Sequence, residues 1–151
     1  MFSKDFRQYL REHRVARLAS LNKDETVHIV PIVFANDSRS IYFAIDKKPK
    51  KTEMLKRLWN IERNPQVTLL LDDYDEDWNR LSYAIIYSKA KILRSQRKEK
   101  TIALFLLKEK YSQYRIGGYL PENSSSTIVI RLTPSRIVQW SAKSALKSSL
   151  I

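Results

Sequence analysis

Short apolar runs rich in β-branched residues, separated by turn residues, dominate the first third of this chain. The runs are VARLASL (15–21), VHIVPIVFA (27–35) and IYFAI (41–45), and NKDE and NDSRS lie between them. Runs of this length bounded by Asn, Asp and Ser are typical of β-strands that follow one another in hairpins. We therefore predict a three-stranded meander over residues 15–45.

Further strands are predicted in the second half of the chain. QVTLLL (66–71) is apolar at nearly every position, which favours a central strand. A longer strand is expected over 80–93, and STIVIRLT (126–133) and RIVQWS (136–141) are expected to be two closing strands. Strands that mostly follow in hairpin order favour an antiparallel barrel with helices at its openings.

Three amphipathic segments are predicted to be helices. Residues 3–13 place apolar side chains at three- and four-residue spacings, and Ser3 is a suitable N-cap. The second helix covers 52–63 with Thr52 as its cap, and the third covers 95–114. The buried stripe of the second helix is expected to consist of Met54, Leu55, Leu58, Trp59 and Ile61.

A single domain over residues 1–151 accounts for all these elements, because no linker or internal repeat divides the chain. Within it we expect an N-terminal helix over 1–13 and a C-terminal tail over 142–151.

The chain has no cysteine and a formal net charge of +12. The missing cysteines exclude a thiol nucleophile, a cysteine zinc site and an iron–sulfur cluster. They fit a reducing cytoplasm, where we expect the protein. No apolar run approaches the ~20 residues of a membrane span, and the charged N-terminus does not resemble a secretory signal. The positive charge calls for an anionic partner.

Metal sites and catalytic triads find little support in the sequence. His13 and His28 stand without companions at ligand spacing. The acidic loop DDYDEDWN (72–79) does not fit a calcium loop, which requires glycine at its sixth position and glutamate at its twelfth, where this chain has Trp78 and Ala84. A Gly-rich phosphate loop and a nucleophile elbow are also missing. We therefore expect no metal and name no catalytic residue.

A strongly basic segment, DKKPKKT (46–52), precedes the second helix. Its ammonium groups repel one another and oppose the positive end of the helix dipole. Together with backbone amides at the helix start and a threonine hydroxyl, they would bind a phosphate. An exposed, solvated turn is the alternative, and the residues alone leave both open. The side chains concerned are Lys47, Lys48, Lys50, Lys51 and Thr52.

Nucleic acid is another anionic partner to weigh for so basic a chain. RSQRKEK (94–100) is interrupted by a glutamate and begins a helix, which favours a solvated face. Tyr42 and Tyr83 are candidate stacking residues, but most strand aromatics alternate as core residues do. We therefore expect a partner other than nucleic acid.

The order of elements resembles the split-barrel flavin and deazaflavin proteins related to pyridoxamine 5′-phosphate oxidase. The resemblance is carried by VARLASLNKDETVHIVPIVF, by IYFAIDKKPKKTEMLKRLWNIERNPQVTLLLDDYDEDW and by RIVQWSA, within residues 14–141. NPQV and DDYDEDW are similar to the branch of probable coenzyme F420-dependent enzymes. The resemblance implies a mainly β (α+β) fold, an antiparallel FMN-binding split β-barrel with flanking helices.

The same resemblance implies a cytoplasmic homodimer with two cofactor sites at the subunit interface. The phosphate-binding part of the family motif falls on Lys50, Lys51 and Thr52, with Lys47 and Lys48 in reach. The strand edge that lines the isoalloxazine or deazaflavin ring, mainly through backbone groups, falls on Val30, Pro31, Ile32 and Val33. Trp78 and Trp140 are implied to border the ring or the substrate pocket, and core packing is the alternative for both.

Departures from the family pattern bear on the substrate. The oxidase carries a basic residue at each end of its second strand motif, where this chain has Val30 and Ala35. It also has a C-terminal Arg-x-His pair, whereas no histidine follows Arg136 here. Both differences count against pyridoxamine phosphate oxidation.

The resemblance instead implies an oxidoreductase that uses F420, or alternatively FMN, and passes hydride to a small acceptor. The acidic tail of F420 would suit a basic protein. A cofactor-binding protein without turnover is the second hypothesis, and a nucleic-acid-binding protein is the third.

Overall fold

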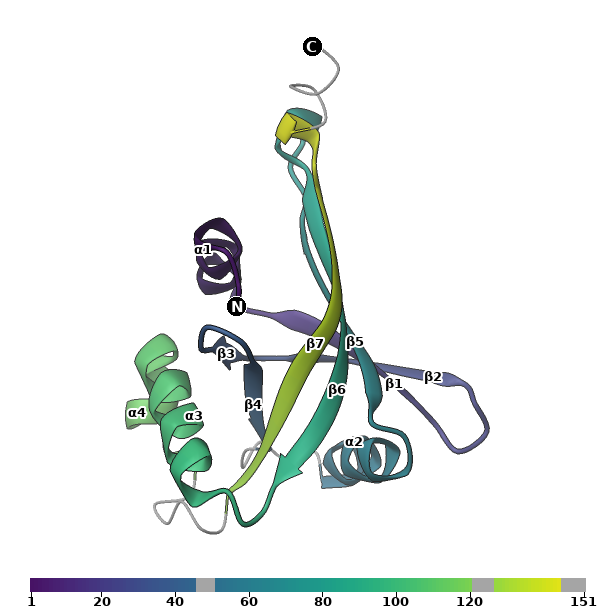
Figure 1. Cartoon of the computed structure of the whole chain (residues 1–151), viewed down its shortest axis with the longest axis vertical. Coiled ribbons are helices and arrows are strands. Elements are labelled where there is room, and N and C mark those ends of the chain that lie inside the picture. The colour runs from purple at the N-terminus through teal and green to yellow at the C-terminus, as the bar shows by residue number, and fades with distance from the viewer. Residues whose placement is uncertain (46–50, 121–126, 145–151) are drawn as a thin grey trace.

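The computed structural model describes residues 1–45, 51–120 and 127–144, with the side chains of 51–55 excluded. Its helices are α1 (Lys4–Glu12), α2 (Lys51–Arg63), the short 3-10 helix η1 (Trp78–Arg80), α3 (Arg97–Lys110) and α4 (Ser112–Ile116). Its strands are β1 (Ala16–Leu21), β2 (Val27–Ile32), β3 (Ala35–Asn36), β4 (Ile41–Ile45), β5 (Gln66–Asp73), β6 (Ser82–Leu93) and β7 (Ile128–Ser141). Figure 1 shows the helices around a strongly curled sheet, from which one end of β5, β6 and β7 projects.

The strands described form one 7-stranded antiparallel sheet in the order β2-β1-β5-β6-β7-β4-β3. β2 and β3 are therefore its two edges, yet only Val33 and Phe34 separate them along the chain. We call these two residues the seam. Because so short a link joins opposite edges, the sheet has to curl until the edges approach each other. This confirms the predicted antiparallel split barrel with flanking helices.

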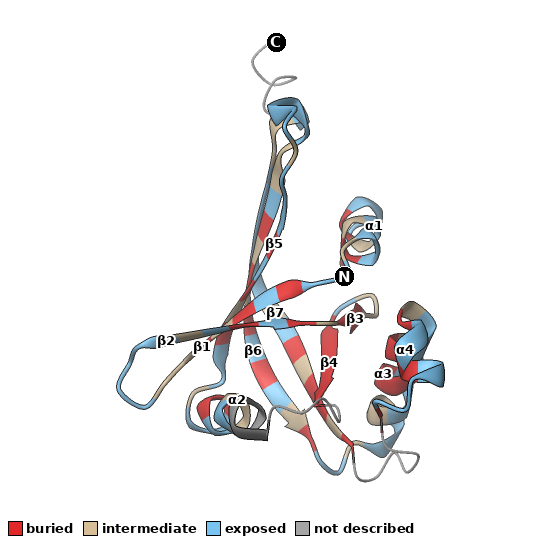
Figure 2. Cartoon of the chain, turned by 180° about the vertical axis from the view of Figure 1, so that it is seen from behind, coloured by how far each residue is buried: buried red, intermediate tan, exposed pale blue. Residues whose placement is uncertain are grey.

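One face of the curled sheet is buried. Leu18 on β1, Leu69 on β5 and Ile86 on β6 are all fully buried and neighbours in register. A second buried cluster lies under α3 and includes Leu104 and Leu107. Figure 2 shows that buried residues gather in the curled part, whereas the projecting ends of the strands are largely exposed.

The opposite side of β2, β1, β5, β6 and β7 carries the alternate residues, and we call it the outer face. One row of cross-strand neighbours on it consists of Ile29, Ala19, Thr68, Tyr87 and Arg136. The next row consists of Pro31, Arg17, Leu70, Ile85 and Val138. Each of these residues is at least partly exposed, although many are apolar.

The first helix forms as its spacing predicts. The Ser3 hydroxyl accepts a hydrogen bond from the Phe6 amide at 3.1 Å, which confirms the predicted N-cap. Phe6 and Leu10 are buried against the sheet. No helix in the described part of the chain is both long and apolar enough to cross a membrane.

The predicted three-stranded meander is wrong. The apolar run at 27–35 divides at the seam into β2 and β3, and β4 pairs with β3 and β7 rather than with β2. Residues 27–35 are nearly all apolar, so their composition gives no sign of a break. The chain nevertheless has to bend there, because this is where the sheet closes into a barrel. The predicted central position of QVTLLL is confirmed, because β5 lies between β1 and β6.

Two other predicted segments have different boundaries. The helix expected over 95–114 breaks at Tyr111 into α3 and α4. The two expected closing strands form one strand, β7, which continues through Pro134, and its register with β6 shifts between Tyr87 and Ser88. A β-bulge of this kind accommodates proline, which has no N–H group, because the bulge already interrupts the hydrogen bonds between the two strands.

Three single-residue expectations also change. α2 begins at Lys51, so Thr52 lies within the helix instead of preceding it. Trp59 is 57% exposed and does not join the buried stripe, whereas Ile61 is buried. Tyr42 is buried and is therefore not available as a stacking residue for bases.

Candidate functional site

The predicted ring-lining segment is an edge of the sheet. Val30 and Ile32 point into the core and are buried, whereas Pro31 is exposed and Val33 is half-buried. Among the strands described, β2 pairs only with β1. Alternate backbone groups of β2 therefore face away from any strand, and Pro31 contributes no N–H there. A ligand along this edge would meet backbone groups rather than the side chains of Val30 and Ile32.

The predicted phosphate-binding segment leads into α2. Lys47, Lys48 and Lys50 lie outside the described residues, and the side chains of Lys51 and Thr52 do as well. The described part of α2 shows what holds the helix in place. The Asn60 amide donates to the Ser20 hydroxyl at 3.1 Å and to the Asn22 side-chain oxygen at 3.0 Å. These bonds fix α2 against β1, the strand that also pairs with β2.

A hollow of about 280 Å³ lies on the outer face next to β2. Small residues, Ala19 and Thr68, form part of its floor, and Val27, Leu21 and Tyr87 stand around it. The hollow is mostly apolar, as small-molecule sites are, and its volume lies just below their usual range of about 300–1,000 Å³. The hollow therefore provides a surface against which an aromatic cofactor could lie.

The two predicted tryptophans lie at the far end of the projecting strands. Trp78 belongs to the turn between β5 and β6 and is 68% exposed. Trp140 is near the end of β7 and stacks on Tyr83, with ring centroids 5.6 Å apart. Figure 1 shows this end of the ribbon on the opposite side of the molecule from α2. Within one chain, the structure does not bring these tryptophans to the start of α2.

The model of one protein family, described as pyridoxamine 5′-phosphate oxidase, matches residues 2–141. The chain belongs to this family. The match extends from the start of α1 to the end of β7 and so includes the whole barrel. None of the curated proteins compared with the chain matches it.

Solved structures with different ligands share this fold. An F420 reductase is 22% identical with a TM-score of 0.59, and the match covers 87% of this chain and 94% of the reductase. The FAD binding protein from Mycobacterium smegmatis is 19% identical with a TM-score of 0.60, over 93% of this chain and 96% of that protein. HutZ, the haem storage protein from Vibrio cholerae, is 13% identical with a TM-score of 0.67, over 93% and 95%. At these identities the likeness shows the fold alone.

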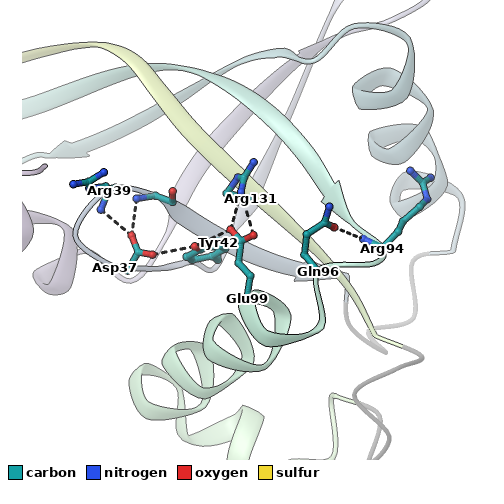
Figure 3. Close-up of polar contacts among 8 residues, drawn as sticks. Asp37, Arg39, Tyr42, Arg94, Gln96, Glu99 and Arg131 are labelled. Carbon is teal, nitrogen blue, oxygen red and sulfur yellow. Dashed lines mark hydrogen bonds and ion pairs between the residues drawn. The ribbon is translucent and has the colours of Figure 1, made fainter.

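A polar network that the sequence did not suggest joins the β3–β4 turn to α3 and β7 (Figure 3). The Tyr42 hydroxyl lies 3.0 Å from an Asp37 carboxylate oxygen and 3.2 Å from one of Glu99. Glu99 in turn accepts from the Arg131 guanidinium. Burial, followed by these two carboxylates, raises the pKa of the Tyr42 hydroxyl. The network has a structural role, because it fastens α3 to the barrel.

A second unpredicted cluster surrounds the seam. The Lys110 ammonium lies 3.8 Å from the centroid of the Phe34 ring and donates to the Leu10 carbonyl at 2.9 Å. Burial, assisted by the nearby Arg14 charge, lowers the pKa of Lys110 to about 7. Burial also raises the pKa of the neighbouring Tyr111 to about 12. Residue spacing in the sequence could not predict this cluster, because its members come from separate elements.

The histidines do not take part in a metal cluster. Within the described ranges, no group of three or more His, Asp or Glu side chains is placed so that it could hold a metal ion. His13 donates a hydrogen bond to the Tyr9 carbonyl through Nδ1 at 2.7 Å. Its Nε2 lies 3.0 Å from an Asp73 carboxylate oxygen. This histidine therefore connects the end of α1 to β5.

Proposed function

We propose that the protein is an oxidoreductase that binds coenzyme F420 and passes hydride from the reduced cofactor to a small electron-poor acceptor. The observation that carries the proposal is the open outer edge of β2, and the hollow on the outer face reaches this strand at Val27. Membership of the family and the F420 reductase with the same fold support it. When bound, the deazaflavin supplies the hydride chemistry, and the chain supplies binding and orientation.

Each part of the site has a separate task in this proposal. The outer edge of β2, over 30–33, would hold the ring through backbone hydrogen bonds. Lys50, Lys51 and Thr52 would bind the phosphate at the start of α2, with Lys47 and Lys48 nearby. α2 is held against β1 by Asn60, so the phosphate-binding segment and the ring-lining strand are carried by neighbouring elements.

The proposal includes a homodimer. Ile29 is 63% exposed and Val138 is 37% exposed, and both lie on the outer face. A sheet face that exposes several large apolar residues is typical of a protein–protein interface. A second copy packed there would cover these residues and close the hollow over a bound ring. The partner's projecting ribbon would then bring Trp78 and Trp140 to a site that they cannot reach within their own chain.

The second candidate is a cofactor-binding protein without turnover, with FMN as the alternative cofactor. The FAD binding protein and the haem storage protein of the same fold favour this candidate. Both cofactor choices place a phosphate at the same lysines, so affinity for each has to be measured directly.

The test is a fluorescence-monitored titration of the purified protein with F420 and, separately, with FMN and haemin. We expect micromolar F420 binding that Lys51→Ala weakens roughly ten- to a hundredfold, because one charged phosphate contact is worth roughly 1.5–3 kcal/mol. Lys56→Ala is the matched control, since Lys56 is an exposed lysine of the same helix. Reduced F420 that is reoxidised by nitro or quinone acceptors only when the protein is present would identify an enzyme.

Other results of these titrations would favour another cofactor or another function. Tight FMN or haemin binding without F420 binding would overturn the choice of cofactor. Cofactor binding without reoxidation would favour the binding protein. Binding of none of the three, together with nucleic acid binding that falls steeply with salt, would overturn the proposal as a whole.

A further inference from the structure

The seam is the point at which the barrel closes. Val33 and Phe34 connect the last residue of β2 to the first residue of β3, and these strands are opposite edges of the sheet. Ile32 is the last residue of β2 paired with β1, through Ala16. Any displacement of the seam would therefore be passed directly to the edge formed by residues 30–33.

One buried hydroxyl holds this seam. The Tyr111 hydroxyl accepts a hydrogen bond from the Phe34 amide at 3.0 Å. The hydroxyl has one proton, which the Phe34 carbonyl and the Arg14 carbonyl share as acceptors, each 2.8 Å from the same oxygen. Tyr111 is only 8% exposed, so water does not replace these bonds readily. Both backbone groups of Phe34 are thus fixed by a single side chain.

The position of Tyr111 comes from the break between α3 and α4. Its backbone amide closes the last turn of α3 on the Leu107 carbonyl at 2.9 Å. The Arg14 guanidinium lies 4.8 Å from the centroid of its ring, and the ring packs edge-on against Tyr114 at 5.9 Å. These contacts fix the position of the Tyr111 backbone and ring, and therefore also the position of its hydroxyl next to the seam.

We propose that Tyr111 is a positioning residue for the cofactor site, which acts by fixing the seam and thereby the ring-lining edge of β2. This inference rests on the proposed function, because it assumes that the edge over 30–33 holds the ring. Tyr111 itself does not touch the ligand. Its hydroxyl holds the edge of β2 in the conformation that binds the cofactor. Binding then does not have to include the entropy cost of ordering this edge.

The experiment compares Tyr111→Phe with Tyr42→Phe. Each substitution removes one buried tyrosine hydroxyl, but the Tyr42 hydroxyl bonds to Asp37 and Glu99 and not to the seam. We expect Tyr111→Phe to weaken F420 or FMN binding about tenfold and to speed hydrogen exchange of the Phe34 amide by a similar factor. Tyr42→Phe should lose stability while its affinity stays within about twofold of the unsubstituted protein.

The outcomes separate this inference from the proposed function. If the unsubstituted protein binds no cofactor, the proposed function fails and the inference fails with it. If that protein binds but Tyr111→Phe binds equally well, the inference alone is overturned. If Tyr111→Phe does not fold, hydrogen exchange of the Phe34 amide in the unsubstituted protein, measured with and without cofactor, tests the inference instead. Cofactor binding should slow exchange of the Phe34 amide about tenfold, and an unchanged rate would overturn the role of the seam.

Discussion

Arg131 on β7 lies 2.9 Å from Glu99 on α3, and both side chains are about three-quarters buried. The pair connects a helix to the strand beneath it, and Tyr42 hydrogen-bonds to the same carboxylate. A charge that loses its partner in such surroundings is costly, because solvent only partly replaces the lost contact.

Glu99→Gln should therefore lower the free energy of unfolding by about 1–3 kcal/mol. Chemical denaturation monitored by circular dichroism measures the change. The matched control is Arg94→Gln, which breaks a far more exposed pair with Glu62 and should cost about 0–1 kcal/mol. Equal losses in the two variants would contradict the structural role of the network.

Lys110 makes stability depend on pH. Its pKa is about 7 in the folded chain against the ordinary 10.5, so the unfolded chain binds more protons between these values. The free energy of unfolding should therefore rise as the pH increases above 7, and the penalty of burying the charge is fully present below it. Between pH 7 and 9, we expect a gain of about 1–2 kcal/mol relative to Lys110→Met.

Urea denaturation of both proteins at each pH measures this difference. Lys108→Met, at an exposed lysine of the same helix, should follow the unsubstituted protein across the range. The difference should be smaller than burial alone implies, because the Leu10 carbonyl and the Phe34 ring favour the charged ammonium. If the unsubstituted protein and Lys110→Met change in parallel, Lys110 does not titrate as described.

The cap of α1 should contribute measurably to stability. Ser3→Ala removes the acceptor for the Phe6 amide and should cost about 1 kcal/mol, which thermal unfolding would detect. Ser3→Asp should restore the loss, because aspartate also caps and favours the positive end of the helix. Failure of the aspartate variant to recover stability would show that the lost contact is not a cap.

The outer face should control self-association. Val138→Asp places a charge on this face, opposite Ile85, and should convert a dimer into monomers in analytical ultracentrifugation. Ile102→Asp is the control, because Ile102 is also an exposed apolar residue but lies on α3, away from the outer face. A monomeric unsubstituted protein, or a dimer that survives Val138→Asp, would contradict the proposed interface.

The existence and type of most elements could be predicted from local patterns. Spacing of apolar residues placed α1, and Ser3 marked its start correctly because a cap involves only neighbouring residues. The run 66–71 was correctly placed in the middle of the sheet. The predicted cofactor-binding residues remain predictions. The basic segment was inferred from its charge and its place before a helix as well as from motif resemblance, and the other residues came from the resemblance alone.

The sequence by itself determined most of the strands and helices, the basic segment and the family, because short-range periodicity and motif order specify these. Only the tertiary structure decided that β4 pairs with β7 and that a two-residue seam closes the barrel. Strand partners depend on how the whole sheet curls, which no local window contains. The same is true of Tyr111 and Lys110, since their hydrogen bonds and burial arise from segments that meet only when the barrel is complete.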